Sequence, residues 1–243
     1  MIDWLRSLVF YVGLLPLTVA YTVAAMLIWP IPLRYRLPVI STWPLVALWW
    51  LRLCCNLRWR IQGFDKLPKT PSVMMCKHQS AWETMALTAF FPSQIWVLKK
   101  EVLWIPFFGQ AIGSLEPIVV DRRRGASALK QVLEQGVQRL HTGFWIAIYP
   151  EGTRVRPGER RRYSRSGAEL ALRANCPLVP IAHNAGLFWP RNTFVKHAGV
   201  IDLVVGDAIA PESKSATLLT AECEDWIEQT SSRLYIEAKE SRR

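Results

Sequence analysis

Residues 73–83 read VMMCKHQSAWE, and this stretch decides the fold. Its apolar run, Val73–Cys76, predicts a short buried strand, and Ser80 in the N-cap position predicts a helix over residues 81–91. A buried strand that leads into a helix is the repeating unit of parallel sheets with helices on both faces. His78 lies between the two elements, so the strand would carry it to the carboxyl edge of the sheet, where ligands bind.

The pattern from residue 56 onward continues to alternate strands with helices. Strands are expected at 58–61, 96–99, 117–120, 144–149, 178–182 and 200–205, and helices at 126–141 and 216–238. We therefore predict an α/β domain over residues 56–243, with a mostly parallel central sheet flanked by helices. Polar segments follow several of these strands and are expected to converge at one edge: 78–83, 121–124, 151–154 and 182–186.

The amino-terminal part is strongly apolar. No charged residue occurs in 8–30, a run long enough to cross a hydrocarbon core of about 30 Å as a helix. A cleaved signal peptide is the alternative, but the run exceeds a signal core of about 7–15 residues and no small-residue cleavage site follows. A second apolar stretch, 37–51, is short and contains two prolines, so a crossing and an interfacial helix both stay open. Residues 1–55 are predicted to form a membrane-anchoring helical hairpin.

The charge of the chain indicates an anionic partner. The 243 residues carry a net charge of +11, which suits nucleic acid, an acidic phospholipid membrane or a phosphorylated ligand. Nucleic acid is disfavoured because no recognised binding motif is present. The arginines that follow residue 51 predict that the rest of the chain faces the cytoplasm. We therefore expect an inner or plasma membrane protein with its α/β domain on the cytoplasmic face. No metal-ligand spacing or cofactor motif occurs, so neither a metal nor a cofactor is expected.

The spacing of His78 and Glu83 permits base catalysis. On one helix a separation of five positions would turn the two side chains about 140° apart, so His78 must precede the helix and fold back over its first turn. Glu83 would then accept a hydrogen bond from one imidazole nitrogen, and the other nitrogen would serve as a general base. Ser80-x-x-Glu83 is also a capping box, so a purely structural role for Glu83 stays open.

A second motif, YPEGTR at 149–154, ends the apolar strand 144–149. It brings a carboxylate, a flexible glycine, a hydroxyl and a guanidinium to the rim of the sheet, and arginine suits bidentate binding of phosphate. The alternative is a strand-end turn with a surface ion pair.

Two basic runs accompany this motif. Of the arginines in 121–124, Arg122 is expected to face the site because it lies nearest the strand, and the others to be solvated. The cluster of arginines in 156–165 suits acidic headgroups or the phosphates of a coenzyme, or forms a solvated loop.

With these residues the chain resembles the 1-acylglycerol-3-phosphate acyltransferase family of glycerolipid acyltransferases over residues 56–206. The family has a histidine followed five positions later by an acid, an apolar strand ending in arginine, a Phe-Pro-Glu-Gly-Thr-Arg block and a proline within an apolar strand. The matches here are His78 with Glu83, residues 119–122, residues 149–154 and Pro180. The chain departs from the family at Glu83, where aspartate is usual, and at Lys77, where asparagine is frequent.

The resemblance implies transfer of a fatty acyl group from acyl-CoA or acyl carrier protein to the sn-2 hydroxyl of lysophosphatidic acid, which forms phosphatidic acid. His78 would be the base and Glu83 its orienting acid. The residues expected to bind substrate are Lys100, Arg122, Glu151, Gly152, Thr153 and Arg154. Phe107 and Phe108 are expected to line an acyl-chain groove.

Two alternatives are also compatible with the sequence. The first is an acyltransferase of the same fold with another acceptor, such as a lysophospholipid, glycerol 3-phosphate or an aminolipid. The second is a non-catalytic basic protein that binds membranes or nucleic acid.

Overall fold

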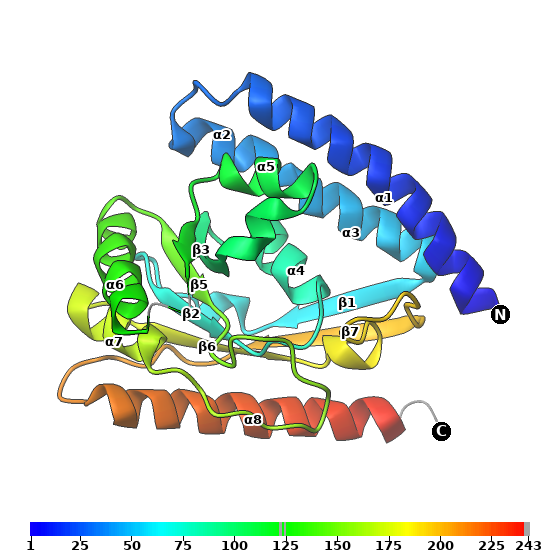
Figure 1. Ribbon diagram of the computed structural model, residues 1–243. Coiled ribbons are helices and arrows are strands. Elements are labelled where there is room, and N and C mark those ends of the chain that lie inside the picture. The colour runs from blue at the N-terminus through cyan, green and yellow to red at the C-terminus, as the bar shows by residue number, and fades with distance from the viewer. Residues whose placement is uncertain (122, 124, 241–243) are drawn as a thin grey trace.

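The computed structural model describes residues 1–121, 123 and 125–240 (Figure 1). The strands are β1 Leu57–Gln62, β2 Val73–Cys76, β3 Gln94–Lys99, β4 Ile118–Val120, β5 Trp145–Ile148, β6 Leu178–His183 and β7 Gly199–Val205. The helices are α1 Ile2–Leu27, α2 Leu33–Ile40, α3 Thr42–Cys55, α4 Trp82–Phe90, α5 Phe108–Gly113, α6 Ala126–His141, α7 Ser166–Ala174 and α8 Ala216–Glu240. Short 3-10 helices are η1 Phe64–Lys66, η2 Lys100–Trp104 and η4 Ala185–Leu187.

The strands form one mixed sheet in the order β1-β7-β6-β2-β5-β3-β4. The five strands from β6 to β4 are parallel. Strand β7 is antiparallel to β6, and β1 is parallel to β7 at the edge of the sheet. The predicted α/β fold with a mostly parallel sheet is therefore confirmed, and the reversed pair β1–β7 is a feature that the strand pattern did not indicate.

Strand β2 lies at the centre of the sheet, between β6 and β5, and all four of its residues are buried. Val73 and Met75 point into a core shared with α6, α7 and α8, whereas Met74 and Cys76 point into a core shared with α3 and α4. Figure 1 shows these layers, with α8 on one side of the sheet and α1 to α5 on the other. The central strand is thus fixed from both faces, and so is the backbone that leaves its carboxyl end.

Helices α1 and α3 form a hairpin whose exposed side chains are largely apolar (Figure 1). Helix α1 and the segment Leu33–Cys55 are each long and apolar enough to cross a membrane, by length and composition alone. The hairpin packs against the α/β part, because α3 contacts α4 and α1 contacts α5. Gly13 allows α1 and α3 to approach closely, since a Cβ atom there would lie 2.3 Å from Trp50 Nε1. The Trp50 indole donates a hydrogen bond to Phe10 O at 3.1 Å.

A buried lysine joins α1 to the loop that follows β6. Lys196 Nζ lies 3.5 Å from the centre of the Tyr11 ring and 4.7 Å from that of Trp189. The ammonium donates a hydrogen bond to Phe194 O at 2.6 Å. The Lys196 side chain is fully buried, and this burial lowers its pKa to about 7. Aromatic faces and one carbonyl therefore take the place of solvent around it.

We predict that Gly13→Leu destabilises the protein by about 1–3 kcal/mol, because the new side chain must displace Trp50 from α1. Val12→Leu is the matched control, since Val12 is 66% exposed and a substitution there should stay within about 0.5 kcal/mol. Thermal unfolding of the detergent-purified variants measures both. Equal midpoints for Gly13→Leu and wild type would contradict the close packing of α1 on α3.

Candidate active site

The turn after β2 is held in place by two backbone hydrogen bonds. Lys77 N donates to Ile181 O at 3.0 Å, which extends the pairing of β2 with β6 by one residue. Val155 N donates to His78 O at 2.8 Å, so the loop that follows β5 is tied to this turn. His78 therefore occupies the carboxyl edge of the sheet, as the strand–helix pattern predicted, next to segment 149–155.

His78 and Glu83 are in direct contact. His78 Nδ1 lies 2.8 Å from Glu83 Oε1, and the Glu83 side chain is fully buried. The same carboxylate accepts hydrogen bonds from the backbone N–H groups of Gln79 and Ser80, both at 2.9 Å. Glu83 thus closes the start of α4 and holds the imidazole at the same time. With Nδ1–H donated to Glu83, the lone pair of His78 falls on Nε2.

The environment of Glu83 favours its ionised form. Burial opposes the charge, but the hydrogen bonds from the His78 imidazole and the Ser80 amide hold the pKa of Glu83 below its usual value. His183 is fully buried, donates from Nε2 to Lys77 O at 2.7 Å and accepts the Ala185 N–H at Nδ1 at 3.1 Å. It is therefore neutral, and burial lowers its pKa. The sequence pattern placed segment 182–186 at this edge but did not indicate that His183 braces the turn before His78.

Tyr149, the first residue of the YPEGTR motif, has a contact that the motif did not indicate. Its ring stacks on the His78 imidazole with centroids 4.2 Å apart and planes 23° apart. The Tyr149 hydroxyl is buried and has no hydrogen-bond partner among the residues that the structure describes. Stacking restricts rotation of the imidazole, so His78 is held by Glu83 at one ring atom and by Tyr149 on one face.

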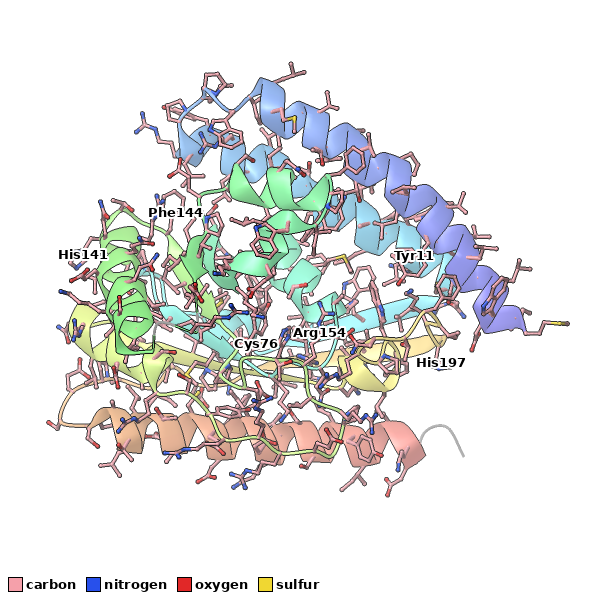
Figure 2. All side chains as sticks on the ribbon, viewed as in Figure 1. Tyr11, Cys76, His141, Phe144, Arg154 and His197 are labelled. Atoms are coloured by element: carbon pink, nitrogen blue, oxygen red, sulfur yellow. The ribbon has the colours of Figure 1, made fainter. Side chains whose placement is uncertain are left out.

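A cavity of about 690 Å³ contains His78 and runs between the hairpin and the sheet. We call it the reaction cavity. Its wall is mostly apolar and comes from α1, α3, α4, β3 and α5; it includes Leu14, Trp43, Met85, Trp96, Phe108 and Ile112. Arg154 and Gly152 line it beside His78. Figure 2 shows Arg154 near the centre of the molecule, between the sheet and the hairpin, with Tyr11 on α1.

The other predicted substrate residues are placed differently. Lys100 Nζ lies 2.6 Å from Asp121 Oδ2, and neither Lys100 nor Thr153 lines the reaction cavity. Arg122 lies outside the described residues. Phe108 lines the cavity, whereas the Phe107 side chain is 49% exposed and lies outside it. The structure therefore brings Gly152 and Arg154 to His78 and keeps Lys100 in a neighbouring ion pair.

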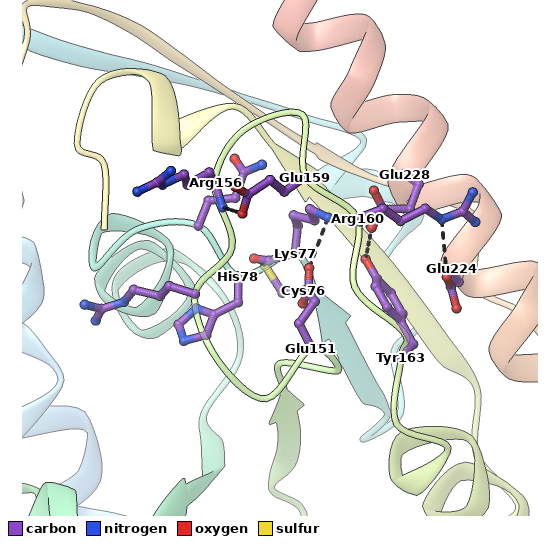
Figure 3. Close-up of polar contacts among 12 residues, drawn as sticks. Cys76, Lys77, His78, Glu151, Arg156, Glu159, Arg160, Tyr163, Glu224 and Glu228 are labelled. Atoms are coloured by element: carbon purple, nitrogen blue, oxygen red, sulfur yellow. Dashed lines mark hydrogen bonds and ion pairs between the residues drawn. The ribbon is translucent and has the colours of Figure 1, made fainter. Parts of the chain in front are cut away.

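Glu151 belongs to a buried network on the far side of the turn. Lys77 Nζ lies 3.1 Å from Glu151 Oε1 and 2.5 Å from Glu228 Oε1, and Tyr163 donates to Glu228 at 2.9 Å. Figure 3 shows the Lys77 side chain turned toward Glu151 and away from the His78 imidazole. Burial raises the pKa of Glu151 to about 7, and Lys77 opposes that rise. Lys77, which departs from the family pattern, is thus the counter-ion of Glu151, and Glu151 does not line the reaction cavity.

The comparisons with known proteins agree with this geometry. A family described as "Acyltransferase" matches residues 58–184. A 1-acyl-sn-glycerol-3-phosphate acyltransferase of Pseudomonas aeruginosa is 39% identical over 216 residues, which cover 88% of this chain and 83% of that protein. The 1-acyl-sn-glycerol-3-phosphate acyltransferase alpha of Homo sapiens is 30% identical over 128 residues, 52% of this chain and 45% of that protein.

The fold is also found in a solved structure. The crystal structure of the 1-acyl-sn-glycerophosphate (LPA) acyltransferase PlsC from Thermotoga maritima matches with a TM-score of 0.80 and covers 96% of each chain. At 19% sequence identity this likeness shows the fold alone. The family resemblance stated from the sequence motifs is confirmed.

We predict that Lys77→Met destabilises the protein by about 3–5 kcal/mol, because it leaves the buried Glu151 and the partly buried Glu228 without their shared cation. The folded-state pKa of Glu151, about 7, is above its ordinary value of 4.5, so the folded protein binds this proton more readily. The destabilisation caused by Lys77→Met should therefore become smaller as the pH is lowered from about 8 to about 5, and thermal unfolding at the two pH values measures it.

Two variants control this measurement. Lys99→Met removes an exposed lysine that also lies 3.1 Å from a glutamate, and it should cost no more than about 1 kcal/mol. Glu151→Gln should recover part of the stability in the Lys77→Met background. A Lys77→Met loss that is the same at both pH values would rule out Glu151 as its origin.

Proposed function

The chain belongs to the acyltransferase family and is an acyltransferase, and from this premise we propose that it transfers a fatty acyl group to the sn-2 hydroxyl of lysophosphatidic acid, forming phosphatidic acid. The observation that carries the proposal is the contact of His78 with the buried Glu83, in which His78 lines an apolar cavity together with Arg154. One cavity thus combines a base for the hydroxyl, a cation for the phosphate and space for a hydrocarbon chain. The name of the Pseudomonas relative supports the same acceptor.

In the proposed reaction His78 Nε2 accepts the proton of the acceptor hydroxyl while Nδ1–H stays bonded to Glu83. The hydroxyl oxygen attacks the thioester carbonyl, the new C–O bond forms and the C–S bond breaks. The imidazolium then returns its proton to the departing thiolate, so His78 ends neutral. Glu83 stabilises the imidazolium in between, as the acid does in a hydrolase triad.

We propose that the acyl group passes directly from the thioester to the acceptor hydroxyl, without an intermediate on a cysteine near His78. Cys76 is the nearest thiol along the chain, but its side chain lies in the core on the α3–α4 side of the sheet. Burial raises the pKa of the Cys76 thiol well above its usual value, so it stays protonated. A thioester is reactive enough for an alcohol to attack it without an intermediate on the protein.

Arg154 is the group we propose for the acceptor phosphate. It lines the reaction cavity, and its guanidinium has no ion-pair partner within the described ranges. Bidentate hydrogen bonds from a guanidinium are well suited to a phosphate monoester. Arg122, and Lys100 if it leaves Asp121, remain proposed partners of the same phosphate, and Gly152, which lines the cavity, is proposed to position the glycerol.

The apolar part of the reaction cavity would hold an acyl chain, and its volume lies within the range of about 300–1,000 Å³ typical of ligand sites. Exposed apolar side chains on α1 and α3 would place the hairpin in a bilayer, and the net charge of +11 favours an anionic leaflet. We propose that the domain faces the cytoplasm of the inner or plasma membrane, where acyl-CoA or acyl carrier protein reaches it.

We predict that His78→Ala lowers acyl transfer from acyl-CoA to lysophosphatidic acid by about 10²–10⁴-fold, because the hydroxyl loses its base. His141→Ala, which changes an exposed histidine at the end of α6, should leave the rate unchanged. Product formation in membranes is the measurement, with thermal unfolding as the test of folding. Full activity in folded His78→Ala would remove His78 from the mechanism.

We predict that Glu83→Asp retains activity and Glu83→Gln does not, because a neutral amide cannot stabilise an imidazolium. Glu83→Gln also weakens the hydrogen bonds from Gln79 and Ser80, at about 1–3 kcal/mol. Acyl-transfer rates and unfolding midpoints of both variants separate the two effects. A Glu83→Gln protein that is less stable but fully active would leave only the helix-closing role.

A further inference from the structure

A second cavity adjoins the reaction cavity. It measures about 630 Å³ and lies at the carboxyl ends of β3, β4 and β5 and the first residues of α6 and α7. The two cavities share the wall residues Val97, Leu98, Tyr149 and Gly152. None of the residues lining this second cavity comes from the hairpin α1–α3. It therefore reaches the His78 region from the side formed by α6 and α7, which lie apart from α1 in Figure 1.

We call this space the arginine cavity, because Arg161, Arg162 and Arg165 line it. Arg165 has Thr217 and Glu169 nearby, at 3.5 Å and 4.0 Å. Arg161 and Arg162 have no ion-pair partner among residues 1–121, 123 and 125–240. The guanidinium groups of Arg161 and Arg162 are thus not neutralised by a carboxylate of the described residues.

The preceding arginine behaves differently. Arg160 lies 3.4 Å from Glu224 and 3.0 Å from Asp225 of α8, so its charge is already compensated (Figure 3). The acidic residue in the cavity wall, Glu151, is compensated by Lys77. The net charge of the residues that line the arginine cavity is therefore positive, although one carboxylate is among them. The rest of the wall is largely apolar and includes Val120, Leu129 and Val132.

We propose that the arginine cavity binds the phosphopantetheine arm of the acyl thioester donor, with Arg161 and Arg162 on its phosphate. This inference rests on the proposed acyl transfer. The thioester carbon must sit at His78 with its acyl chain in the reaction cavity, so the thiol carrier has to leave through another opening. The carrier is an uncharged chain that ends in a phosphate, which matches apolar walls followed by guanidinium groups.

The position of the cavity favours the donor over the acceptor. The acceptor is a lipid and reaches the site from the hairpin side, where Arg154 already provides a cation in the reaction cavity. The donor is water-soluble and needs an entrance away from the hairpin, and the shared wall at Tyr149 and Gly152 brings this second cavity beside the imidazole. The same arm is present in acyl-CoA and in acyl carrier protein, so both donors would use it.

The test is steady-state kinetics of the full chain in detergent–lipid micelles. Lysophosphatidic acid is saturating while the donor is varied, and it is varied at saturating donor to obtain its own KM. The donors are acyl-CoA, acyl carrier protein and S-acyl-pantetheine, which has the same arm without phosphate. The variants are Arg161→Ala, Arg162→Ala and the double variant, with Arg160→Ala as the matched control that removes the same charge from the same loop.

We expect the double variant to lose about tenfold or more in kcat/KM for donors that carry the phosphate, because it loses at least one charged hydrogen bond. S-acyl-pantetheine should be used equally well by wild type and double variant, and the KM for lysophosphatidic acid should not change. Losses with acyl-CoA and not with acyl carrier protein would assign the arginines to the nucleotide phosphates of CoA and overturn the shared site.

Three other results would overturn the proposal: equal losses on all donors, a raised KM for lysophosphatidic acid, or the same loss in Arg160→Ala. A wild-type protein that transfers no acyl group to lysophosphatidic acid would instead refute the proposed function. Equilibrium titration with CoA gives a second readout, since the double variant should bind it about tenfold more weakly than wild type.

Discussion

The buried carboxylate of Glu83 is the constraint on which the rest of the site depends. A charge with no access to water has to be satisfied by protein donors, and here the donors are the His78 imidazole and the Gln79 and Ser80 amides. These hydrogen bonds to Glu83 fix the turn between β2 and α4. The helix-closing role and the orienting role of Glu83 are therefore one arrangement, because the hydrogen bonds that close α4 also place the imidazole. His183 and Tyr149 hold the same turn from two other sides.

Much of the fold was predictable from local patterns, because each strand of the parallel part is short, apolar and followed by a helix. Strand β2 and helix α4 begin and end within a residue of their predicted bounds. The order of the strands and the reversal at β6–β7 were not predictable, because the direction of a strand depends on how its connection crosses the sheet. The segment between β6 and β7 contains only the short helix η4, and it returns the chain antiparallel to β6.

The site was predictable where partners are close in sequence and not where they are distant. The spacing of His78 and Glu83 was sufficient to predict their contact, since the capping geometry is local. The partner of Lys77 on α8, Glu228, is 151 positions away, and the amphipathic pattern of α8 contains no sign of it. Lys77 directly precedes His78, and Glu151 is paired with the Lys77 ammonium and not with Arg154. This pairing depends on the tertiary fold, whereas the motif alone shows only that residue 151 is a carboxylate.

The contact of α1 with Lys196 shows that the hairpin is packed as part of the folded domain and does not only attach it to a membrane. Phe10 of α1 and Leu48 and Leu51 of α3 share one hydrophobic core with Trp82 at the start of α4. A shortened chain that began at residue 56 would uncover that core and leave the reaction cavity open along one side. Solubilising this protein by truncation would thus remove part of its interior, and detergent or lipid around an intact amino terminus is the condition under which its chemistry can be studied.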